Sequence, residues 1–351
     1  LPSHALWDMS RKIRASETLT AAFDDGLDDV LERLAGDGSA DATELLADWD
    51  AFIHEFGSRG PNEWDMYADS WETRPALPLA ALDRVRFQSD DESPQLRHDA
   101  VAANRETTTA EVRAKVADDE ELAGMVEAAL IASNMMAYRE RTKTTIVKVI
   151  HEGRMVFREL GRRHADAGDI ADADHVFLLL EQELDDFIAD PASFKDPLVE
   201  RAAAYEALWD LEPPFIVRDG IVPPLSQWER RTEAPAKEKA GTGTEIAGVS
   251  GSPGVVRGTA RVVLDPGDPT ALDPGDILVA PYTDPSWTPL FMTAGGVVVD
   301  VGGQISHAVI VSRELGLPCV ISATDATRRI PDGATVEVDG DTGTVTVVES
   351  A

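Results

Sequence analysis

Long hydrophobic runs are absent from this sequence of 351 residues. No stretch of about 18 or more apolar residues occurs, which excludes a membrane-spanning helix. The first four residues are not a basic segment leading into an apolar one, so no signal peptide is predicted. An initiator methionine is also missing, which indicates a processed chain or part of a longer one. The single cysteine, Cys319, excludes an internal disulfide, and we expect a cytoplasmic protein.

Lysine is scarce, whereas acidic residues are abundant. The chain has seven lysines among 32 basic residues, against 64 aspartates and glutamates, so its net charge at pH 7 is −32. This balance argues against binding a nucleic-acid backbone, which requires a basic surface. It is typical of halophile adaptation, in which salt screens the repulsion between carboxylates; an ordinary acidic mesophile protein is the alternative. With 43% apolar residues, the chain can bury substantial cores.

The N-terminal two thirds of the chain have a helical composition, rich in alanine, leucine, arginine and acidic residues. Apolar side chains recur there at three- and four-residue steps, the spacing of one helix face, as at Leu19, Phe23, Leu27, Val30 and Leu34. The sequence predicts one long helix or two over residues 121–164, and another helix over 172–189. Residues 90–94, Asp-Asp-Glu-Ser-Pro, are typical of a solvated loop.

Residues 229–244 differ from the segments on either side. They lack apolar periodicity and carry proline, glycine and charge, which predicts a flexible linker. A coil of this length reaches roughly 20–25 Å, so the segment could serve as a hinge. We therefore predict three parts: a helical part over 1–228, this linker, and a C-terminal domain over 245–351.

After the linker, the sequence has the pattern of short β-strands. Runs of β-branched residues bounded by glycine, proline and aspartate predict strands within 255–263, 276–280, 296–300, 319–321, 335–338 and 344–348. The last two flank the hairpin signal Asp339-Gly340-Asp341. A helix is predicted over residues 307–315. The expected fold class is therefore multidomain, with a mainly α-helical N-terminal part and a compact α/β domain at the C-terminus.

A glycine-rich turn before this helix carries the main candidate site. Gly302 and Gly303 permit a tight turn close to a ligand, and Ser306 is an N-cap residue type. His307 then lies in the first turn of a helix that ends at Gly316. Free N–H groups and the positive end of the helix dipole stabilise a phosphate at such a position. Because neutral imidazole is a nucleophile, His307 is the candidate phosphoryl acceptor; a capping or packing role is the alternative.

Six motifs occur in order through the C-terminal domain. They are Ser252-Pro253-Gly254 and the segments 274–279, 283–289, 302–308, 313–318 and 338–340. Together they resemble the mobile phosphohistidine domain of the phosphoenolpyruvate-utilising enzymes, a group that includes pyruvate phosphate dikinase, phosphoenolpyruvate synthase, rifampicin phosphotransferase and phenylphosphate synthase. The resemblance covers nearly all of residues 245–349. It implies a three-layer β/β/α swivelling domain in which His307 is phosphorylated.

The resemblance also implies roles for the residues around the histidine. Those expected to bind or support the phosphate are Gly302, Gly303, Ser306, Thr283 and Arg313. Asp300 departs from the glutamate expected at the end of the preceding strand. Ile305 stands where the dikinase and the synthase usually have threonine, and an apolar residue there is closer to the rifampicin phosphotransferase branch.

Two islands of the helical part, residues 56–65 and 157–163, resemble the substrate domain of rifampicin phosphotransferase-like proteins. The resemblance implies that residues 1–228 bind a substrate, with Arg59 and Glu63 as candidates on the acceptor side. Where the family has Gly-His-Arg-Gly, this chain has Gly57-Ser58-Arg59-Gly60, so any role of that histidine is missing. A structural turn fixed by an Arg–Glu pair is the alternative for this island.

Three further cations belong to the predicted long helix. Arg139 and Lys143 lie one turn apart on one face, and Arg154 falls about 60° around from Arg139 on an ideal helix. Apolar residues share this face, so the cations need an anion, either a carboxylate or a phosphate. A structural salt bridge is one interpretation. The other, which the resemblance implies, is that these residues act in phosphoryl transfer when His307 docks.

No phosphate-binding loop of the form Gly-x-x-x-x-Gly-Lys-Ser/Thr occurs, and no other segment indicates a nucleotide site. In the family, an ATP-grasp domain phosphorylates the histidine, commonly from the β-phosphate of ATP, leaving AMP and phosphate. The resemblance therefore implies an ATP-grasp domain or subunit as partner, with ATP and Mg²⁺ bound there and no cofactor in this chain. No metal-ligand spacing stands out, so no metal site is predicted.

The predicted function is that of an ATP-dependent phosphotransferase component of the dikinase type. His307 accepts a phosphoryl group by way of the ATP-grasp partner and passes it to a small hydroxyl or enol acceptor at the helical part. Two alternatives stay open: a non-catalytic phosphocarrier or regulatory module, and part of a split phosphoenolpyruvate synthase. A pocket lined by Arg139 and Lys143 would favour the enzyme, and a flat apolar helical face the carrier.

Overall fold

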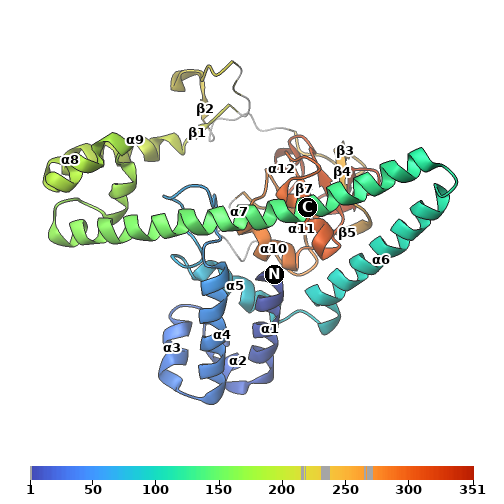
Figure 1. Cartoon of the computed structure of the whole chain (residues 1–351), viewed down its shortest axis with the longest axis horizontal. Coiled ribbons are helices and arrows are strands. Elements are labelled where there is room, and N and C mark those ends of the chain that lie inside the picture. The colour runs from blue at the N-terminus through green and yellow to red at the C-terminus, as the bar shows by residue number, and fades with distance from the viewer. Residues whose placement is uncertain (1, 215–216, 218, 231–237, 265, 267–271) are drawn as a thin grey trace. The chain divides into compact units, whose positions relative to one another are not determined.

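The computed structural model describes residues 2–214, 217, 219–230, 238–264, 266 and 272–351 (Figure 1). Its contacts divide the chain into two compact units. The first holds Leu1–Glu63, Ala68–Val147 and Glu238–Ala351, and the second holds Trp64–Tyr67 and Lys148–Lys237. The helical part therefore contributes to both units, and the domain limits proposed from the sequence stay a prediction. Among the described helices, none is both long and apolar enough to cross a membrane.

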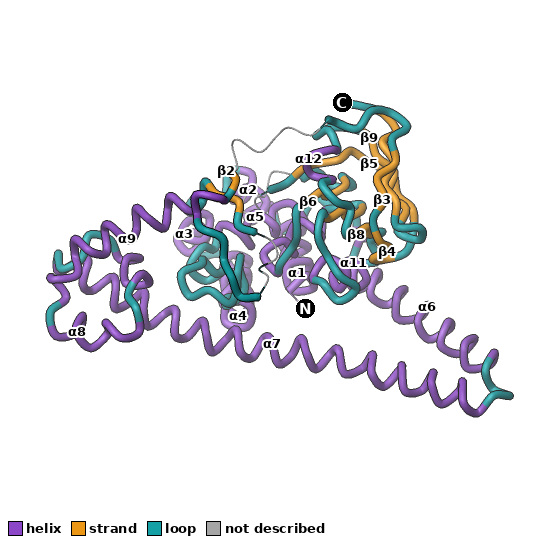
Figure 2. Tube along the Cα trace, turned by 90° about the horizontal axis from the view of Figure 1, so that it is seen from above, coloured by secondary structure: helices purple, strands orange, loops and turns teal. Residues whose placement is uncertain are grey.

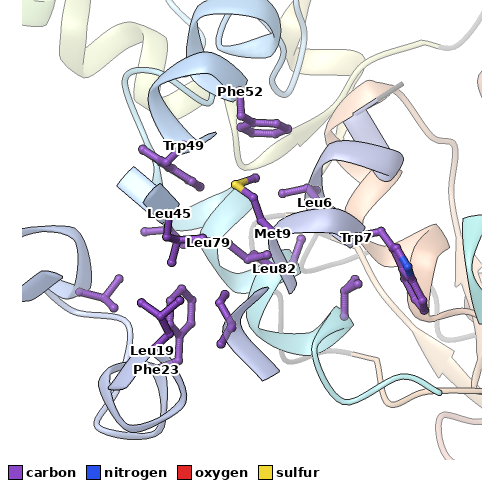
Figure 3. Packing of buried hydrophobic residues seen from close by; sticks show 14 of the residues in the cluster. Leu6, Trp7, Met9, Leu19, Phe23, Leu45, Trp49, Phe52, Leu79 and Leu82 are labelled. Carbon is purple, nitrogen blue, oxygen red and sulfur yellow. The ribbon is translucent and has the colours of Figure 1, made fainter. Parts of the chain in front are cut away.

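The N-terminal helices of the first unit pack around one apolar core (Figure 3). They are α1 (Pro2–Ala15), α2 (Glu17–Asp24), α3 (Val30–Asp37), α4 (Ala40–Phe56) and α5 (Ala76–Val85). Ser16 and Ser39 begin α2 and α4 as N-caps, each accepting a hydrogen bond from a backbone N–H three residues later, at 3.4 and 3.2 Å. Leu6, Leu45 and Leu82 bring α1, α4 and α5 into the same buried cluster.

The apolar spacing over residues 19–34 is divided between two helices, α2 and α3. Gly26 separates them with a φ of 107°, a left-handed conformation that a side chain disfavours. Leu19, Phe23, Val30 and Leu34 are nevertheless all buried in the same core. The periodicity thus identified the buried face correctly on both sides of the break.

Helices α6 (Pro94–Lys115) and α7 (Glu120–Ala167) follow the N-terminal core. Helix α7 is a single helix of 48 residues, which confirms one long helix over 121–164 and carries the chain from the first unit into the second. Residues 90–94, predicted as a loop, instead form a 3-10 turn, η1 (Asp90–Glu92), and the start of α6. The Ser89 N–H donates to Glu92 Oε2 at 2.9 Å and so stabilises this turn.

The second unit packs the end of α7 against short helices around Ile170, Val176, Phe187 and Leu198. Its elements are η2 (Ala173–Leu178), η3 (Glu181–Glu183), α8 (Leu184–Ala189), η4 (Pro191–Phe194), α9 (Lys195–Leu208), η5 (Leu225–Gln227) and the antiparallel pair β1 (Leu211–Glu212) and β2 (Glu229–Arg230).

The prediction of one helix over residues 172–189 is wrong. Leu179 and Leu180 are extended, and only α8 is α-helical. The cause is a tertiary contact at Glu183, whose Oε2 accepts the Leu180 N–H at 2.9 Å. Its two carboxylate oxygens also pair with Arg201 of α9 at 2.6 Å. In a continuous helix, the Leu180 N–H would donate to a backbone carbonyl of the preceding turn. Because it donates to the Glu183 carboxylate instead, the helix is interrupted here and a new turn begins.

The C-terminal domain is built on an eight-stranded sheet with the order β3-β10-β9-β5-β6-β7-β8-β4. Its strands are β3 (Glu245–Ala247), β4 (Val249–Ser252), β5 (Val255–Val262), β6 (Ile277–Ala280), β7 (Gly296–Val299), β8 (Cys319–Ile321), β9 (Thr335–Asp339) and β10 (Thr344–Glu349). Strands β5 to β8 pair in parallel, and the outer pairs are antiparallel. Figure 2 shows most strands in this domain, whereas the N-terminal part is helical, which confirms the predicted fold class.

Successive side chains of the central strands enter two different cores. Leu278 and Val297 belong to the core that α10 (Thr288–Thr293) and α11 (His307–Leu315) cover. Ile277 and Val298 belong to the core completed by β9, β10 and α12 (Ala326–Arg329). Burial on both faces explains why β6 and β7 are continuous apolar runs. The sequence predictions missed β3, β4, α10 and α12, which are short.

The predicted linker is only partly separate from the domain that follows it. Residues 231–237 lie outside the described residues. Residues 238–244 instead bind the C-terminal domain: the Ala240 N–H donates to the Arg329 carbonyl at 2.7 Å and the Gly243 N–H to the Val347 carbonyl at 2.8 Å. Backbone hydrogen bonds therefore hold residues 240 and 243 on this domain, and the limits of the linker stay a prediction. Its role as a hinge stays a prediction.

Candidate active site

His307 is the first residue of helix α11, directly after the loop that leaves β7. Ser306 precedes the helix in an extended conformation, with φ −70° and ψ 161°, and its carbonyl accepts the Ile310 N–H at 3.1 Å. Gly316 ends the helix with a φ of 67°. The predicted helix over 307–315 is confirmed. It forms here because Ala308, Val309, Val311, Ser312 and Leu315 are all buried, giving it an apolar face against the sheet.

The imidazole of His307 is held on two sides by residues of the segment before α11. Its Nδ1 lies 3.1 Å from Thr283 Oγ1, and its Nε2 lies 3.5 Å from Thr288 Oγ1. Phe291 meets the ring edge to face, with 5.6 Å between centroids. Thr283 was a predicted supporting residue. Thr288 and Phe291 were not predicted, because helix α10, which carries both, was not recognised in the sequence.

The surroundings of His307 favour its neutral form. Burial, together with the positive charges of Lys143 and Arg59, lowers the pKa of His307 to about 3. The ring is therefore neutral at pH 7. With its proton on Nδ1, it donates to Thr283 Oγ1 and leaves the Nε2 lone pair available as a nucleophile. The two cations that disfavour a proton attract a phosphoryl group, which carries the opposite charge.

A cavity of about 170 Å³ lies beside His307 within the first unit. Arg59, Arg139 and Lys143 line it from the helical part, and Thr288 and His307 line it from the C-terminal domain. The sequence placed these residues in separate domains, and the tertiary structure brings them to one space. Arg139 and Lys143 share one face of α7, as their spacing predicted.

Glu63 fixes two of these cations. Its side chain is 1% exposed, and its carboxylate oxygens lie 3.0 Å from Arg59 Nη1 and 3.1 Å from Lys143 Nζ. Arg59 Nη2 also donates to Thr144 Oγ1 at 3.0 Å. The structural salt bridge weighed from the sequence therefore exists. It leaves Arg59 and Lys143 facing the cavity, so the structural and functional interpretations are compatible.

The turn that presents Arg59 depends on two glycines. A Cβ on Gly57 would meet the Ile53 carbonyl oxygen, and one on Gly60 would meet the backbone of Asp69 and Ser70. The Arg59 carbonyl accepts the Trp71 N–H at 2.6 Å, which ties the turn to the segment before α5. Ser58, which replaces the expected histidine, is buried. Close backbone approach thus explains the glycines of this island.

Arg154 has a structural environment in the second unit. It is fully buried, and its guanidinium donates to the carbonyls of Met66 at 3.2 Å and Asp65 at 2.8 Å. Its Nη1 lies 3.0 Å from His151 Nδ1. These contacts join α7 to the segment 64–67. The acceptor-side role predicted for Arg154 stays a prediction.

The loop before His307 is fixed by the residues expected to support a phosphate. Arg313 donates to the Gly251 carbonyl and to Gln304 Oε1, both at 2.9 Å, so it holds the loop from behind. Gly302 lies close to Ser306 and Ile321, whereas Gly303 faces open space. Among the described residues, the buried Ser306 Oγ has no hydrogen-bond partner. A hydroxyl in this position could donate to a phosphoryl oxygen on the adjacent His307.

Asp300, which stands where glutamate was expected, has a partner in the structure. It accepts a hydrogen bond from the Thr327 N–H at 2.9 Å and another from the Thr327 hydroxyl. Burial raises the pKa of its carboxyl group. Asp300 therefore joins the end of β7 to α12. Within the described ranges, no group of three or more His, Cys, Asp or Glu side chains could hold a metal ion.

Two family models match the chain. The one described as "PEP-utilising enzyme, mobile domain" matches residues 272–343, from the start of the β6 region to the end of β9. The one described as "Rifampicin phosphotransferase fourth domain" matches residues 2–140. The first match contains His307, and the second contains Arg59, Glu63 and Arg139. Together they confirm the resemblance inferred from the sequence motifs.

Several curated proteins are similar to this chain over most of its length. An uncharacterized protein of Mycobacterium tuberculosis is 35% identical over 92% of this chain and 33% of its own length. A rifampicin phosphotransferase of Streptomyces sviceus is 31% identical over 98% of this chain and 39% of its own length. The prodigiosin synthesizing transferase PigC of Serratia marcescens is 33% identical over 86% of this chain and 33% of its own length. The chain thus spans between a third and two fifths of these relatives.

Proposed function

We propose that this chain, a member of the phosphoenolpyruvate-utilising enzymes by its mobile domain, is a phosphotransferase component that carries a phosphoryl group on His307 and delivers it to an acceptor hydroxyl. The observation that supports this most is the cavity shared by His307, Arg59, Arg139 and Lys143. A nucleophilic nitrogen and several cations around one cavity are what transfer of a charged group requires.

In the proposed loading step, Nε2 of His307 forms a bond with the β-phosphorus of ATP while the P–O bond to AMP breaks. Water then displaces the γ-phosphate as inorganic phosphate, which leaves one phosphoryl group on Nε2. The Nδ1 proton stays on the ring and is held by Thr283. In the second step, the acceptor oxygen attacks phosphorus, the P–N bond breaks, and its electron pair returns to Nε2. The acceptor's proton is released to solvent. Arg59 and Lys143 stabilise the negative charge on the equatorial oxygens during transfer.

The donor in this proposal is ATP, bound with Mg²⁺ on an ATP-grasp domain or subunit, which would place the reaction in the cytoplasm. Division into two sites has a physical advantage. Each transfer then occurs where its own groups are pre-organised and water is excluded, so the phosphoryl group is not lost to hydrolysis. The cations that line the cavity beside His307, namely Arg59, Arg139 and Lys143, belong to the acceptor side of this cycle.

The size of the cavity limits how the acceptor binds. Its volume of about 170 Å³ is smaller than the roughly 300–1,000 Å³ that encloses a drug-sized ligand. We infer that only the reacting end of a large acceptor would enter. Rifampicin is one acceptor to test, because similar proteins bear the name rifampicin phosphotransferase. A simple phenol and pyruvate, whose enol would accept, test the other acceptor classes.

The chain can be loaded chemically, without a partner, by treatment with phosphoramidate. We expect acid-labile phosphate on His307, mapped by mass spectrometry at alkaline pH, and none there in His307→Ala. His54→Ala is the matched control, since His54 is exposed on α4. Phosphate confined to another residue would contradict the assignment of His307. Loading of His307 that no acceptor discharges would favour the phosphocarrier alternative.

The same preparation tests the cations. Lys143→Ala should still be loaded, whereas onward transfer to a competent acceptor should slow by roughly two orders of magnitude, the scale for loss of one pre-organised donor. Phosphorus NMR follows both species. Lys115→Ala, on the exposed end of α6, is the matched control and should transfer at the normal rate. Normal transfer by a folded Lys143→Ala would show that Lys143 serves only the salt bridge with Glu63.

A further inference from the structure

Helix α10 has contacts that the proposed chemistry does not use. Thr288 and Phe291 lie against His307, and Phe291 belongs to the core beneath α11. Met292, the next residue, belongs instead to the core of the N-terminal helices, together with Leu79, Leu82 and other side chains of that cluster. It is 3% exposed. One short helix therefore contacts His307 through Thr288 and Phe291 and packs into the core of the N-terminal helices through Met292.

The backbone of α10 is also bound by the helical part. The Met292 carbonyl lies in the last turn of α10, where helical carbonyls have no partner within the helix. Gln88, which is 4% exposed and follows α5, donates its Nε2 hydrogen to this carbonyl at 2.6 Å. The Gln88 carbonyl in turn accepts from Arg11 at 2.8 Å and from Arg14 at 2.9 Å, so α1 fixes the residue.

A third contact between the helical part and the C-terminal domain is made by Arg84. Arg84, in the last turn of α5, donates to the Leu272 carbonyl and lies 3.2 Å from Asp273 Oδ1. Leu272 is itself in the core of the C-terminal domain. Gln88 lies four residues after Arg84, beyond the end of α5, and the two residues contact the C-terminal domain through different segments, at Met292 and at Leu272.

We propose that Met292, Gln88 and Arg84 form a docking latch that sets His307 in position for the cavity cations. They are positioning residues and touch no reacting atom. The C-terminal domain fills its own two cores without Met292, so burial of this side chain depends on docking to the helices. The purpose of the latch rests on the proposed function, whereas its existence as a docking contact can be tested separately.

Removal of the latch should expose His307. In the full chain, diethylpyrocarbonate should modify His307 faster in Met292→Ala than in the wild type. We expect an increase of about ten-fold or more, since full burial of a Met side chain changes an equilibrium by roughly ten- to a hundred-fold. Gln88→Leu should act in the same direction, because docking would then leave the Met292 carbonyl unpaired. Reactivity at the exposed His54 is the internal reference.

Matched substitutions separate docking from general damage. Met125→Ala removes an exposed methionine of α7 and should leave His307 reactivity unchanged, and Met292→Leu should largely restore the wild-type rate. Hydrogen exchange should rise in α5 and α10 of Met292→Ala but not in β6 to β8. This pattern supports the latch. Unchanged His307 reactivity and exchange in both Met292→Ala and Gln88→Leu would overturn it.

The transfer assay distinguishes failure of the latch from failure of the proposed function. After phosphoramidate treatment, Met292→Ala should be loaded as well as the wild type but should discharge to acceptor about ten-fold more slowly or worse, because docking precedes transfer. If His307 of the wild type takes no phosphate, the proposed function fails while the reactivity and exchange data still decide the latch. Faster reactivity with normal discharge would show that docking at these residues does not position His307, and would overturn the inference.

Discussion

Glu63 is the residue on which the electrostatics of the cavity depend. A buried carboxylate is costly unless it is paired, and Glu63 is paired by Arg59 and Lys143 in one place. The two cations are thereby held in place by the protein itself, so the proposed transfer would need no further ordering of them. Their charge also reaches His307, where it lowers the pKa of the imidazole in addition to the effect of burial. One ion-pair network thus fixes two cations of the cavity and adds to the effect of burial, which keeps His307 neutral.

The lowered pKa of His307 predicts a pH dependence of stability. The native pKa is about 3, whereas an unfolded histidine titrates near about 6.5. Between these values the unfolded chain binds a proton that the native chain does not, so this group reduces stability as pH falls from about 6.5 toward 3. His307→Gln lacks the effect. In urea unfolding, the variant should therefore gain stability relative to the wild type between pH 7 and about pH 4.5.

The control for this measurement is His54→Gln, at an exposed position of α4. Its stability relative to the wild type should change little over the same pH range. Many carboxylates also titrate there, and the comparison at each pH removes their shared contribution. A His307→Gln difference that stays constant with pH would contradict a strongly lowered pKa.

At the scale of elements, helix α7 contains glycines with opposite surroundings. At Gly161, the helix approaches η2 so closely that a Cβ would meet the Ala173 carbonyl oxygen and Val176. At Gly124, a Cβ would find nothing within 4 Å. Glycine disfavours helix at both positions, but only Gly161 is required by packing. The difference explains why a helix of 48 residues keeps a glycine in the island 157–163.

This contrast gives a paired prediction. Gly161→Ala should destabilise the second unit by about 1–3 kcal/mol, the range for overpacking. Gly124→Ala should be neutral or stabilise its helix by up to about 1 kcal/mol. Hydrogen exchange resolved by segment measures each effect where it arises. If both substitutions changed the free energy of unfolding by the same small amount, the close packing of α7 against η2 would not require glycine at position 161.

At the scale of the whole molecule, the excess of acidic residues dominates. The structure contains exposed ion pairs, such as Arg113–Glu127 and Arg162–Glu159, which salt weakens. However, 64 acidic residues face only 32 basic ones, so most carboxylates meet net repulsion from the rest of the chain. Screening of this repulsion is the larger effect, and it is expected to stabilise the fold.

The melting temperature should therefore rise with KCl. Between about 0.1 and 1 M salt the screening length falls from about 10 Å to about 3 Å, which removes most interactions between separated surface charges. Thermal melts followed by circular dichroism measure the effect. At about pH 4, where many carboxylates become protonated, the slope should be smaller. A melting temperature independent of salt at pH 7 would leave the protein as an ordinary acidic one.

The sequence by itself determined the features that depend on local rules. The strands from residue 255 onward, the helix that begins at His307 and is followed by Gly316, and the single face shared by Arg139 and Lys143 all follow from periodicity, caps and turn residues. The motifs around His307 also identified the mobile domain. Short helices such as α10 and α12 were not predicted, because four to six residues are too few to show a helical periodicity.

Only the tertiary structure decided which residues meet. The predicted helix over 172–189 is interrupted before Glu183, whose carboxylate binds the Leu180 N–H and Arg201 of another helix. Glu63 pairs with Arg59 and with Lys143 of a distant segment. Met292, from the C-terminal domain, is buried in the core of the N-terminal helices. The physical reason is common to all three. A buried charge needs a partner of opposite charge, and a large apolar side chain is stable when it is buried. The residues that meet these needs are distant in the sequence and become neighbours only in the folded chain.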